Sequence, residues 1–323
     1  MSMHKPLVNW DTAIDAYLTS RHVLGRMYKK EAYFLNNIRT FLVKAGANDL
    51  DQSLFDQWRK CACHLSVSTR VVRERAVYNF CHYRRRREAD CFLPDPDSLA
   101  RPGPRPLPII IERAQIVQLL HYVSMLRPKS HETLRPAILR MAIILLYTTG
   151  LRRGELVRLT LADVDTQRGV FFIRESKCHK SRWVPLSSSV CVELRTFINL
   201  RRQAGIDSRN NSPLICKSRG GAYSNDGFCN SVKTVLIAAD IKDHRGYYPR
   251  VQDFRHSFAV TALLRWYENN ADVQVNLPKL ALYMGHVSII STAYYLRWMP
   301  AVIAHASKRF ERSYAQILEG GTS

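Results

Sequence analysis

The chain lacks any uninterrupted run of about twenty apolar residues, the length that a helix needs to cross a bilayer, so we expect no membrane-spanning segment. Residues 1–10 also lack the apolar core of a secretion signal, which favours a cytoplasmic protein. The eight cysteines are scattered at irregular intervals, without paired Cys-x-x-Cys knuckles. This pattern indicates reduced thiols and disfavours a disulfide framework.

Metal-binding patterns are scarce as well. Cys61, Cys63 and His64 lie near Cys81 and His82 in the sequence, which raises the question of a zinc site. A Cys-x-Cys pair within a predicted helix cannot present both thiols on one face, so we predict buried helical cysteines, with zinc as the alternative. No acidic cluster has the spacing of magnesium or calcium ligands, which disfavours a metal-dependent nuclease.

Acidic residues are few relative to basic ones. The 323 residues include 27 aspartates and glutamates against 48 lysines and arginines, which gives a formal net charge of +21. An excess of this size predicts a polyanionic partner, namely DNA, RNA or an anionic membrane surface. Hydrophobic residues make up 46% of the chain, which is typical of a globular protein and argues against wholesale disorder.

Residues 1–92 predict a small helical domain. Apolar residues recur at helical spacing in four segments, Trp10–Leu18, Tyr28–Leu42, Leu54–Cys61 and Val72–Tyr83, and a run of four arginines follows. Residues 93–108 contain six prolines. Because proline removes a backbone donor and restricts the residue before it, this stretch predicts an extended linker.

Residues 109–323 predict a larger second domain. The segment Ala137–Tyr147 is apolar nearly all round and should form a buried helix that ends at Gly150. Two strands, Val170–Arg174 and Trp183–Leu186, flank a predicted turn. Further helices are expected at 190–202, 225–239, 254–269 and 277–284, and an amphipathic helix at 301–318.

Four segments of this second domain carry arginine, lysine, histidine and tyrosine in a fixed order. They are Thr149–Leu156 (TGLRRGEL), Lys177–Leu186 (KCHKSRWVPL), Gln252–Ala259 (QDFRHSFA), and Met284–Ser288 (MGHVS) followed by Tyr295. Together they resemble the catalytic domain of the tyrosine recombinases, the phage-integrase family, over residues 109–309. The preceding helical domain resembles the family's core-binding domain by its position and helicity.

The resemblance implies a mainly α fold with a small β-hairpin sheet in the catalytic domain. The helical domain (1–92) and the catalytic domain (109–323) would form a two-domain clamp around double-stranded DNA, with the linker (93–108) crossing one side. The helix at 301–318 would dock on a neighbouring protomer, or else pack on its own domain.

The resemblance also implies chemical roles for four basic residues. Arg152 and Arg255 would hold the scissile phosphate, because a planar guanidinium donates two hydrogen bonds to a phosphate in fixed geometry. Lys177, on the predicted hairpin, would protonate the departing 5′ oxygen. His286 would hydrogen-bond the phosphate.

Tyr295 is the nucleophile that the resemblance implies. A phenol has a free pKa of about 10 and becomes reactive only with cations and a hydrogen-bond partner beside it. The adjacent Tyr294 has the same chemistry, but Tyr295 stands in the family's register after His286.

Supporting and DNA-binding roles follow from position. Glu155, one turn after Arg152, would orient that arginine by a salt bridge, and His256 is expected to be structural. Lys180 and Arg182 share the hairpin and are expected to contact backbone phosphates. The same role is predicted for Arg84, Arg85, Arg86, Arg87, Arg101 and Arg105, with solvated side chains as the alternative.

One residue departs from the family pattern. Gln252 stands where the third motif of the family has a histidine, and glutamine can donate a hydrogen bond but cannot shuttle a proton. The proton of Tyr295 must then pass elsewhere, for example to water or by way of His286. Slow activity, a need for a partner subunit, or an inactive regulatory relative would each follow from this change.

The function that the resemblance implies is site-specific DNA recombination (integration, excision or transposition) through a 3′-phosphotyrosine intermediate, with no cofactor and no metal. The implied assembly is a homotetramer on two DNA sites, or a hetero-assembly with related recombinases, at the nucleoid of a bacterial cytoplasm. Two other functions stay open. One is a DNA-binding accessory or regulatory relative with weak activity or none, and the other is a type IB topoisomerase, which uses tyrosine chemistry on one duplex.

Overall fold

The computed structural model describes residues 10–104, 106–127, 133–174 and 181–298. The chain divides into two compact units, Met1–Pro106 and Leu107–Ser323. Both are mainly helical, and the second contains a small three-stranded sheet, so the predicted fold class is confirmed. None of the helices in the described ranges combines the length and the apolar character that a bilayer crossing requires.

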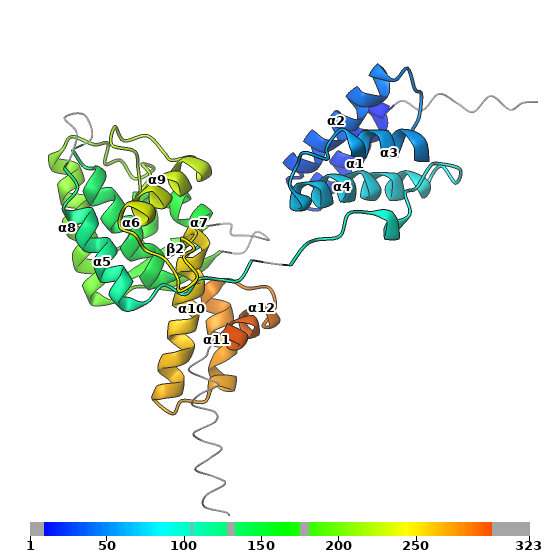
Figure 1. The fold of residues 1–323 in the computed structure, drawn as a ribbon. Helices are drawn as coiled ribbons and strands as arrows, with labels where there is room; N and C mark the ends of the chain where they lie inside the picture. The colour runs from blue at the N-terminus through cyan, green and yellow to red at the C-terminus, as the bar shows by residue number, and fades with distance from the viewer. Residues whose placement is uncertain (1–9, 105, 128–132, 175–180, 299–323) are drawn as a thin grey trace, which may run out of the picture. The chain divides into compact units, whose positions relative to one another are not determined.

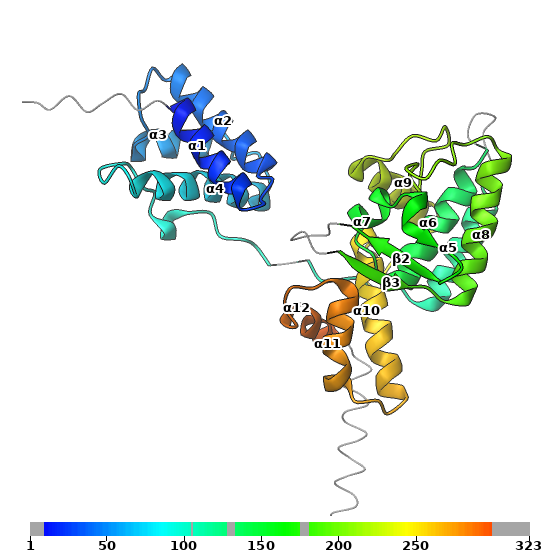
Figure 2. The same ribbon diagram turned by 180° about the vertical axis from the view of Figure 1, so that it is seen from behind.

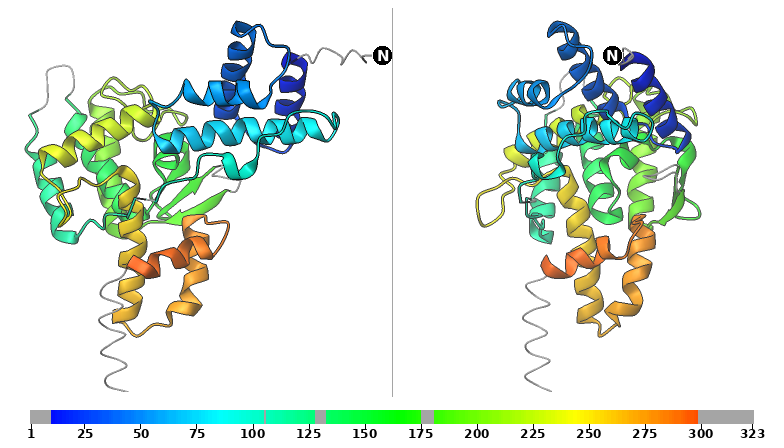
Figure 3. Two further views of the ribbon diagram at one scale, coloured as in Figure 1. Left: turned by 45° about the vertical axis from the view of Figure 1, so that its right-hand side comes forward. Right: turned by 90° about the vertical axis from the view of Figure 1, so that its right-hand side faces the viewer.

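The first unit packs four helices around an aromatic core. They are α1 (Trp10–Val23), α2 (Lys29–Lys44), α3 (Gln52–Lys60) and α4 (Val67–Arg85), the last seen along its length in the left view of Figure 3. The Asp51 carboxylate caps α3 by accepting a hydrogen bond from the Leu54 backbone N–H at 2.8 Å. The buried aromatic side chains are Trp10, Tyr17, Phe55, Trp58 and Phe80.

The proline-rich segment begins as part of this unit. A short 3-10 turn, η1 (Pro96–Ser98), leads to Leu99, whose side chain is buried in the aromatic core. Arg59 donates to the Ser98 carbonyl at 2.8 Å, and the Ala100 N–H donates to Glu74 at 2.8 Å. Residues 96–100 therefore pack on the helices, which corrects the prediction of an extended linker over all of 93–108.

The second unit is built around α6 (Arg135–Thr149). Four helices pack against it and surround it in Figures 1 and 2, namely α5 (Arg113–Ser124), α8 (Ser188–Gln203), α9 (Asn225–Ala238) and α10 (Val251–Glu268). From Ile138 to Leu146 every residue except Arg140 is buried, as the uniformly apolar sequence predicts. The helix ends at Gly150 with φ of 58°, a left-handed conformation that favours glycine.

The sheet is an antiparallel meander of β1 (Val164–Asp165), β2 (Val170–Ile173) and β3 (Arg182–Pro185), which follows the short helix α7 (Arg153–Arg158). Phe171 of β2 pairs with Val184 of β3, and both side chains are buried, so one face of the sheet packs into the core. The sequence predicts β2 and β3 but not β1, because two residues are too few to show strand alternation.

The end of α10 joins three further elements in a smaller helical group, visible in Figure 1. They are α11 (Val273–Met284), α12 (Ile290–Ala293) and the 3-10 turn η3 (Tyr294–Trp298). Their apolar side chains form a cluster that includes Leu263, Leu280, Met284 and Tyr295. Like α6, α11 ends at a left-handed glycine, Gly285, with φ of 65°.

Candidate active site

Arg255, near the start of α10, is a buried arginine with 1% exposure. Its guanidinium donates to the Gly150 carbonyl at 2.7 Å and to the Met284 carbonyl at 2.6 Å, at the ends of α6 and α11. Helix C-termini carry partial negative charge, so the two helix ends compensate a cation that burial would otherwise penalise. Burial, together with the charge of Arg152, lowers the pKa of Arg255 to about 10, which leaves it protonated at neutral pH.

Three arginines from different segments converge on the end of α11, and we call Arg152, Arg182 and Arg255 the arginine cluster. Arg182 of β3 donates to the carbonyl of residue 283 at 2.7 Å, Arg255 to that of residue 284, and Arg152 to that of residue 285 at 2.9 Å. The last carbonyls of a helix have no partner within the helix. Here, three consecutive carbonyls receive hydrogen bonds from the cluster, so the end of α11 holds the three guanidinium groups together.

Glu155 holds two members of the cluster. Its carboxylate accepts hydrogen bonds from Arg152 Nη1 at 2.8 Å and from Arg182 Nη2 at 2.9 Å, and its side chain is 1% exposed. Burial would raise the pKa of Glu155, but the hydrogen bonds and charges of Arg182 and Arg152 outweigh it and lower that pKa to about 2. The salt bridge that the sequence predicts between Glu155 and Arg152 is thus present, and a second arginine shares it.

His286 follows Gly285 at the end of α11. Its Nδ1 lies 2.6 Å from the hydroxyl of Thr292, a fully buried side chain on α12. Burial, with the charges of Arg255, Arg152 and Arg182, lowers the pKa of His286 to about 4. At neutral pH this imidazole is therefore neutral, and its Nδ1 is fixed by Thr292.

Tyr295 lies on η3 with 3% exposure. Its hydroxyl is 3.2 Å from His256 Nδ1, and its ring is stacked with that of His286 at a centroid separation of 6.2 Å. Burial raises the pKa of Tyr295, although the charge of Arg255 acts in the opposite direction. The neighbouring Tyr294 packs edge-on against the ring of Tyr295.

The fold therefore brings most of the predicted catalytic and supporting residues together. They are Arg152, Glu155, Arg255, His256, His286 and Tyr295, contributed by α7, α10, the end of α11 and η3. Gln252 lies one turn before His256 on α10, and its side chain is exposed. Lys177, Lys180 and Arg105, like the predicted helix at 301–318, lie outside the described residues.

The predicted DNA contacts divide by burial. Arg84 is 2% exposed and pairs with Asp49 and Glu88 within the first unit, which argues against the predicted phosphate contact. Arg182 also lies inside the site, where Glu155 and the carbonyl of residue 283 occupy its guanidinium. Arg85, Arg86, Arg87 and Arg101 are exposed, and their contact with DNA stays a prediction.

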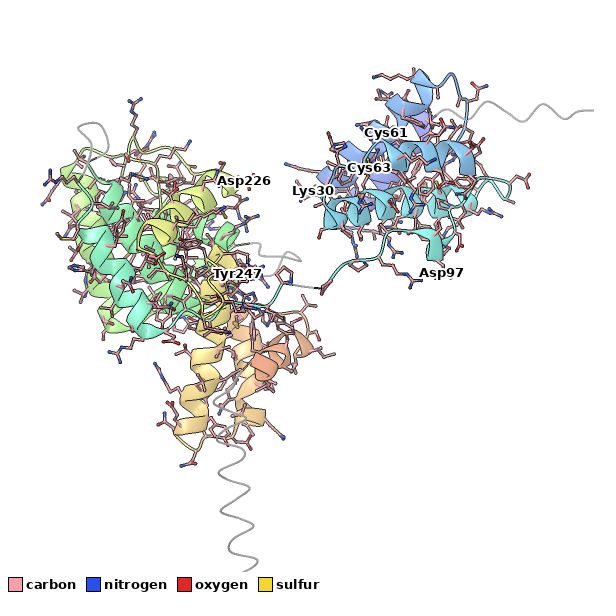
Figure 4. The ribbon with its side chains drawn as sticks, in the orientation of Figure 1. Lys30, Cys61, Cys63, Asp97, Asp226 and Tyr247 are labelled. Carbon is pink, nitrogen blue, oxygen red and sulfur yellow. The ribbon has the colours of Figure 1, made fainter. Side chains whose placement is uncertain are left out.

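The cysteines of the first unit differ from the prediction. Cys81 is buried, whereas Cys61 and Cys63 (labelled in Figure 4) are exposed. The prediction of buried helical thiols is wrong for these two, because α3 ends at Lys60 and they lie in the turn that follows. Within the described ranges, no three histidine, cysteine or acidic side chains group as a metal site would need.

Two features of the site were not predicted from the sequence. The contact between Thr292 and His286 had no signal, because a single threonine six residues after a histidine carries no recognisable pattern. The proximity of His256 to the Tyr295 hydroxyl depends on the packing of α10 against η3. Both contacts join elements whose relative placement only the tertiary fold determines.

Comparison with known proteins gives a consistent result. A model of the phage integrase family matches residues 110–300. The chain is 30% identical over 319 residues, 96% of each protein, to y4rE of Sinorhizobium fredii, provisionally named an integrase/recombinase. It is 28% identical to the tyrosine recombinase XerD of Staphylococcus epidermidis, over 65% of this chain and 63% of XerD.

Solved structures with a similar fold include two recombinases bound to DNA. The Tn1549 transposon integrase in complex with transposon right-end DNA aligns with a TM-score of 0.64 at 16% identity, over 94% of this chain and 99% of that chain. The XerH site-specific recombinase bound to its palindromic difH substrate aligns with a TM-score of 0.62 at 17% identity, over 87% and 78%. At these identities the likeness concerns the fold.

Proposed function

The chain belongs to the phage integrase family of tyrosine recombinases, and from this premise we propose that it breaks and rejoins DNA strands through Tyr295 in site-specific recombination. The single observation that carries the proposal is the environment of the Tyr295 side chain. The buried hydroxyl lies 3.2 Å from His256, the charges of Arg255 and Arg152 act on it, and the ring of His286 stacks on the phenol. These are the groups that a phosphodiester attack needs.

The arginine cluster has hydrogen-bonding capacity left for a phosphate. A guanidinium carries five N–H donors, and the carbonyl contacts of Arg255 use two of them. Arg152 is 25% exposed, so a DNA phosphate can approach it from solvent. Both cations would offset the negative charge that grows on the non-bridging oxygens during attack.

In the proposed cleavage step, the Tyr295 oxygen bonds to the scissile phosphorus and the bond to the 5′ oxygen breaks. The products are a 3′-phosphotyrosine and a free 5′ hydroxyl, with Lys177 as the proposed donor of the proton that the leaving oxygen takes. A 5′ hydroxyl from the partner duplex then attacks the phosphotyrosine and reseals the strand. One ester replaces another in each step, so the reaction consumes no ATP.

The proposed partner is double-stranded DNA, which agrees with the net charge of +21 and with the DNA-bound relatives. Exchange between two duplexes requires four active tyrosines, so we propose a homotetramer on two sites, or a mixed assembly with related recombinases. Binding should weaken steeply with salt, since phosphate contacts release counterions.

The test is covalent capture on nicked duplexes drawn from the DNA that flanks the gene. The wild type, Tyr295→Phe and the matched control Tyr294→Phe are incubated in EDTA and separated on a denaturing gel. We expect a protein–DNA adduct with the wild type and Tyr294→Phe, and none with Tyr295→Phe. An adduct that survives in Tyr295→Phe would refute the assignment of the nucleophile.

Gln252 is the observation that favours a second candidate, a DNA-binding accessory protein. That candidate predicts tight, salt-sensitive binding without an adduct, and Gln252→His would then be the variant that restores cleavage. Relaxation of supercoiled DNA without formation of four-way junctions would instead indicate topoisomerase activity.

A further inference from the structure

The hydroxyl of Tyr295 has a histidine nitrogen beside it that the cleavage step above does not use. His256 Nδ1 lies 3.2 Å from the hydroxyl oxygen, and the two ring centroids are 5.4 Å apart. Building on the proposed function, we infer that His256 is a catalytic residue that accepts the proton of the Tyr295 hydroxyl as the phenol attacks the phosphate. The nitrogen touches the attacking oxygen itself, so the transfer needs no intervening group.

The other polar neighbours of Tyr295 are poorer proton acceptors. Arg255 can only donate hydrogen bonds. The Nδ1 of His286 is occupied by Thr292 at 2.6 Å, and the contact between His286 and Tyr295 is ring against ring, with 22° between the planes. Bulk water has little access, because Tyr295 is 3% exposed.

The protonation state of His256 suits this role. Burial lowers the pKa of His256; of the nearby charged side chains, Asp253 and Arg255 of α10 raise and lower it respectively, and Arg250, just before α10, lowers it. From η3, the group that faces it is the phenol of Tyr295. The imidazole is therefore neutral at physiological pH, and with its proton on Nε2 it presents a lone pair on Nδ1.

The helical turn that carries His256 is held on both sides. Arg255, the residue before it, is bonded to the ends of α6 and α11. Ser257, the residue after it, is buried and accepts a hydrogen bond from the Ile111 backbone N–H at 2.8 Å. A proton acceptor fixed in this way keeps its geometry through the reaction.

The inferred step balances in atoms and electrons. As the Tyr295 oxygen forms its bond to phosphorus, its proton moves to His256 Nδ1 and the imidazole becomes a cation. The bond from phosphorus to the 5′ oxygen breaks with its electron pair, and that oxygen takes a proton from the donor proposed above. In the resealing step, the phenolate leaves phosphorus and recovers its proton from His256.

The test measures the rate of adduct formation on a nicked duplex that the wild type binds. His256→Asn keeps a hydrogen-bonding side chain but cannot take the proton. We expect a loss of about 10²–10⁴-fold in rate, with unchanged DNA affinity, and partial rescue of His256→Ala by added imidazole. The matched control is His121→Asn, the same substitution at an exposed histidine of α5, which should cleave like the wild type.

A modified substrate separates proton acceptance from proton donation. Sulfur in place of the 5′ bridging oxygen leaves without being protonated, so it rescues the loss of a proton donor but not that of an acceptor. We expect the rate defect of His256→Asn to persist on this substrate. We also expect the wild-type rate to fall as the pH is lowered, because His256 becomes protonated, and this fall to be absent in His256→Asn. Full rescue by sulfur, or a His256→Asn rate equal to that of the wild type, would overturn the inference.

Failure of the proposed function would look different. A wild type that binds the duplex and forms no adduct would remove the tyrosine chemistry, and the role of His256 with it. A measurement without DNA tests the contact alone, namely the ¹⁵N resonances of His256 in the wild type and in Tyr295→Phe. We expect the Nδ1 resonance to shift when the hydroxyl is removed, and an unchanged resonance would refute the contact.

Discussion

Replacing Glu155 with glutamine should destabilise the second unit by about 3 kcal/mol near neutral pH. The carboxylate is 1% exposed and is shared by Arg152 and Arg182. Its pKa of about 2, against 4.5 for an ordinary glutamate, corresponds to about 3 kcal/mol at roughly 1.4 kcal/mol for each pH unit. The amide of glutamine also leaves the guanidinium groups of Arg152 and Arg182 without a counter-charge, which adds to the loss.

The assay is urea unfolding of the full chain at pH 7, fitted with separate transitions because two units need not unfold together. The matched control is Glu193→Gln, since Glu193 pairs with Arg140 at 2.7 Å but the two side chains are 41% and 38% exposed. An exposed pair of this kind is worth about 0–1 kcal/mol. If Glu155→Gln lowers the free energy of unfolding no more than Glu193→Gln does, the stabilising role given to the buried carboxylate is refuted.

The stabilities of the wild type and of Glu155→Gln should also depend differently on pH. The pKa of Glu155 is lower in the folded protein than in the unfolded chain, so its contribution is complete above about pH 4.5 and is lost as pH falls toward 2. The stability of the wild type should therefore fall more steeply than that of Glu155→Gln on the acid side of pH 4.5. Parallel curves in this range would contradict the assignment.

Three further predictions concern other parts of the chain. Arg84→Ala should destabilise the first unit by about 3 kcal/mol, because it removes the buried guanidinium that pairs with Asp49. In contrast, Arg86→Ala, at an exposed arginine, should leave urea unfolding unchanged and reduce the salt slope of DNA binding by about 1. Gly150→Ala should lower the free energy of unfolding by about 2–4 kcal/mol in the same assay, because the added Cβ would lie 2.4 Å from the ring of Phe258. Gly205 is also left-handed but has nothing within 4 Å, so Gly205→Ala should lower it less. Thr292→Val should slow adduct formation about tenfold, because His286 loses the partner of its Nδ1 and one lost hydrogen bond is worth about that factor in rate. An unchanged rate would show that Thr292 does not position His286.

The sequence was most informative where local pattern decides structure. The apolar segment Ala137–Tyr147 predicted the central helix α6, and alternation with a polar turn predicted β2 and β3. Four short motifs in order indicated the family, and the family model matches the residues that contain them. These signals are local, so a single chain displays them without its tertiary structure.

The fold also has features that a local pattern cannot reveal. The burial of Arg84 depends on Asp49, which lies thirty-five residues earlier in the chain and pairs with it across the first unit. Arg182 looked like a surface cation of a hairpin, yet Glu155 and the end of α11 enclose it. In both cases the partner is distant in sequence, and only the packed fold determines which arginine meets solvent.

The carbonyls that the arginine cluster binds give the site a mechanical property. The carbonyl of Gly285, held by Arg152, lies only ten residues before Tyr295 on the same stretch of chain. Any displacement of the Arg152 guanidinium therefore acts directly on this stretch of chain. The position of this cation and that of the Tyr295 hydroxyl are linked through ten residues of backbone.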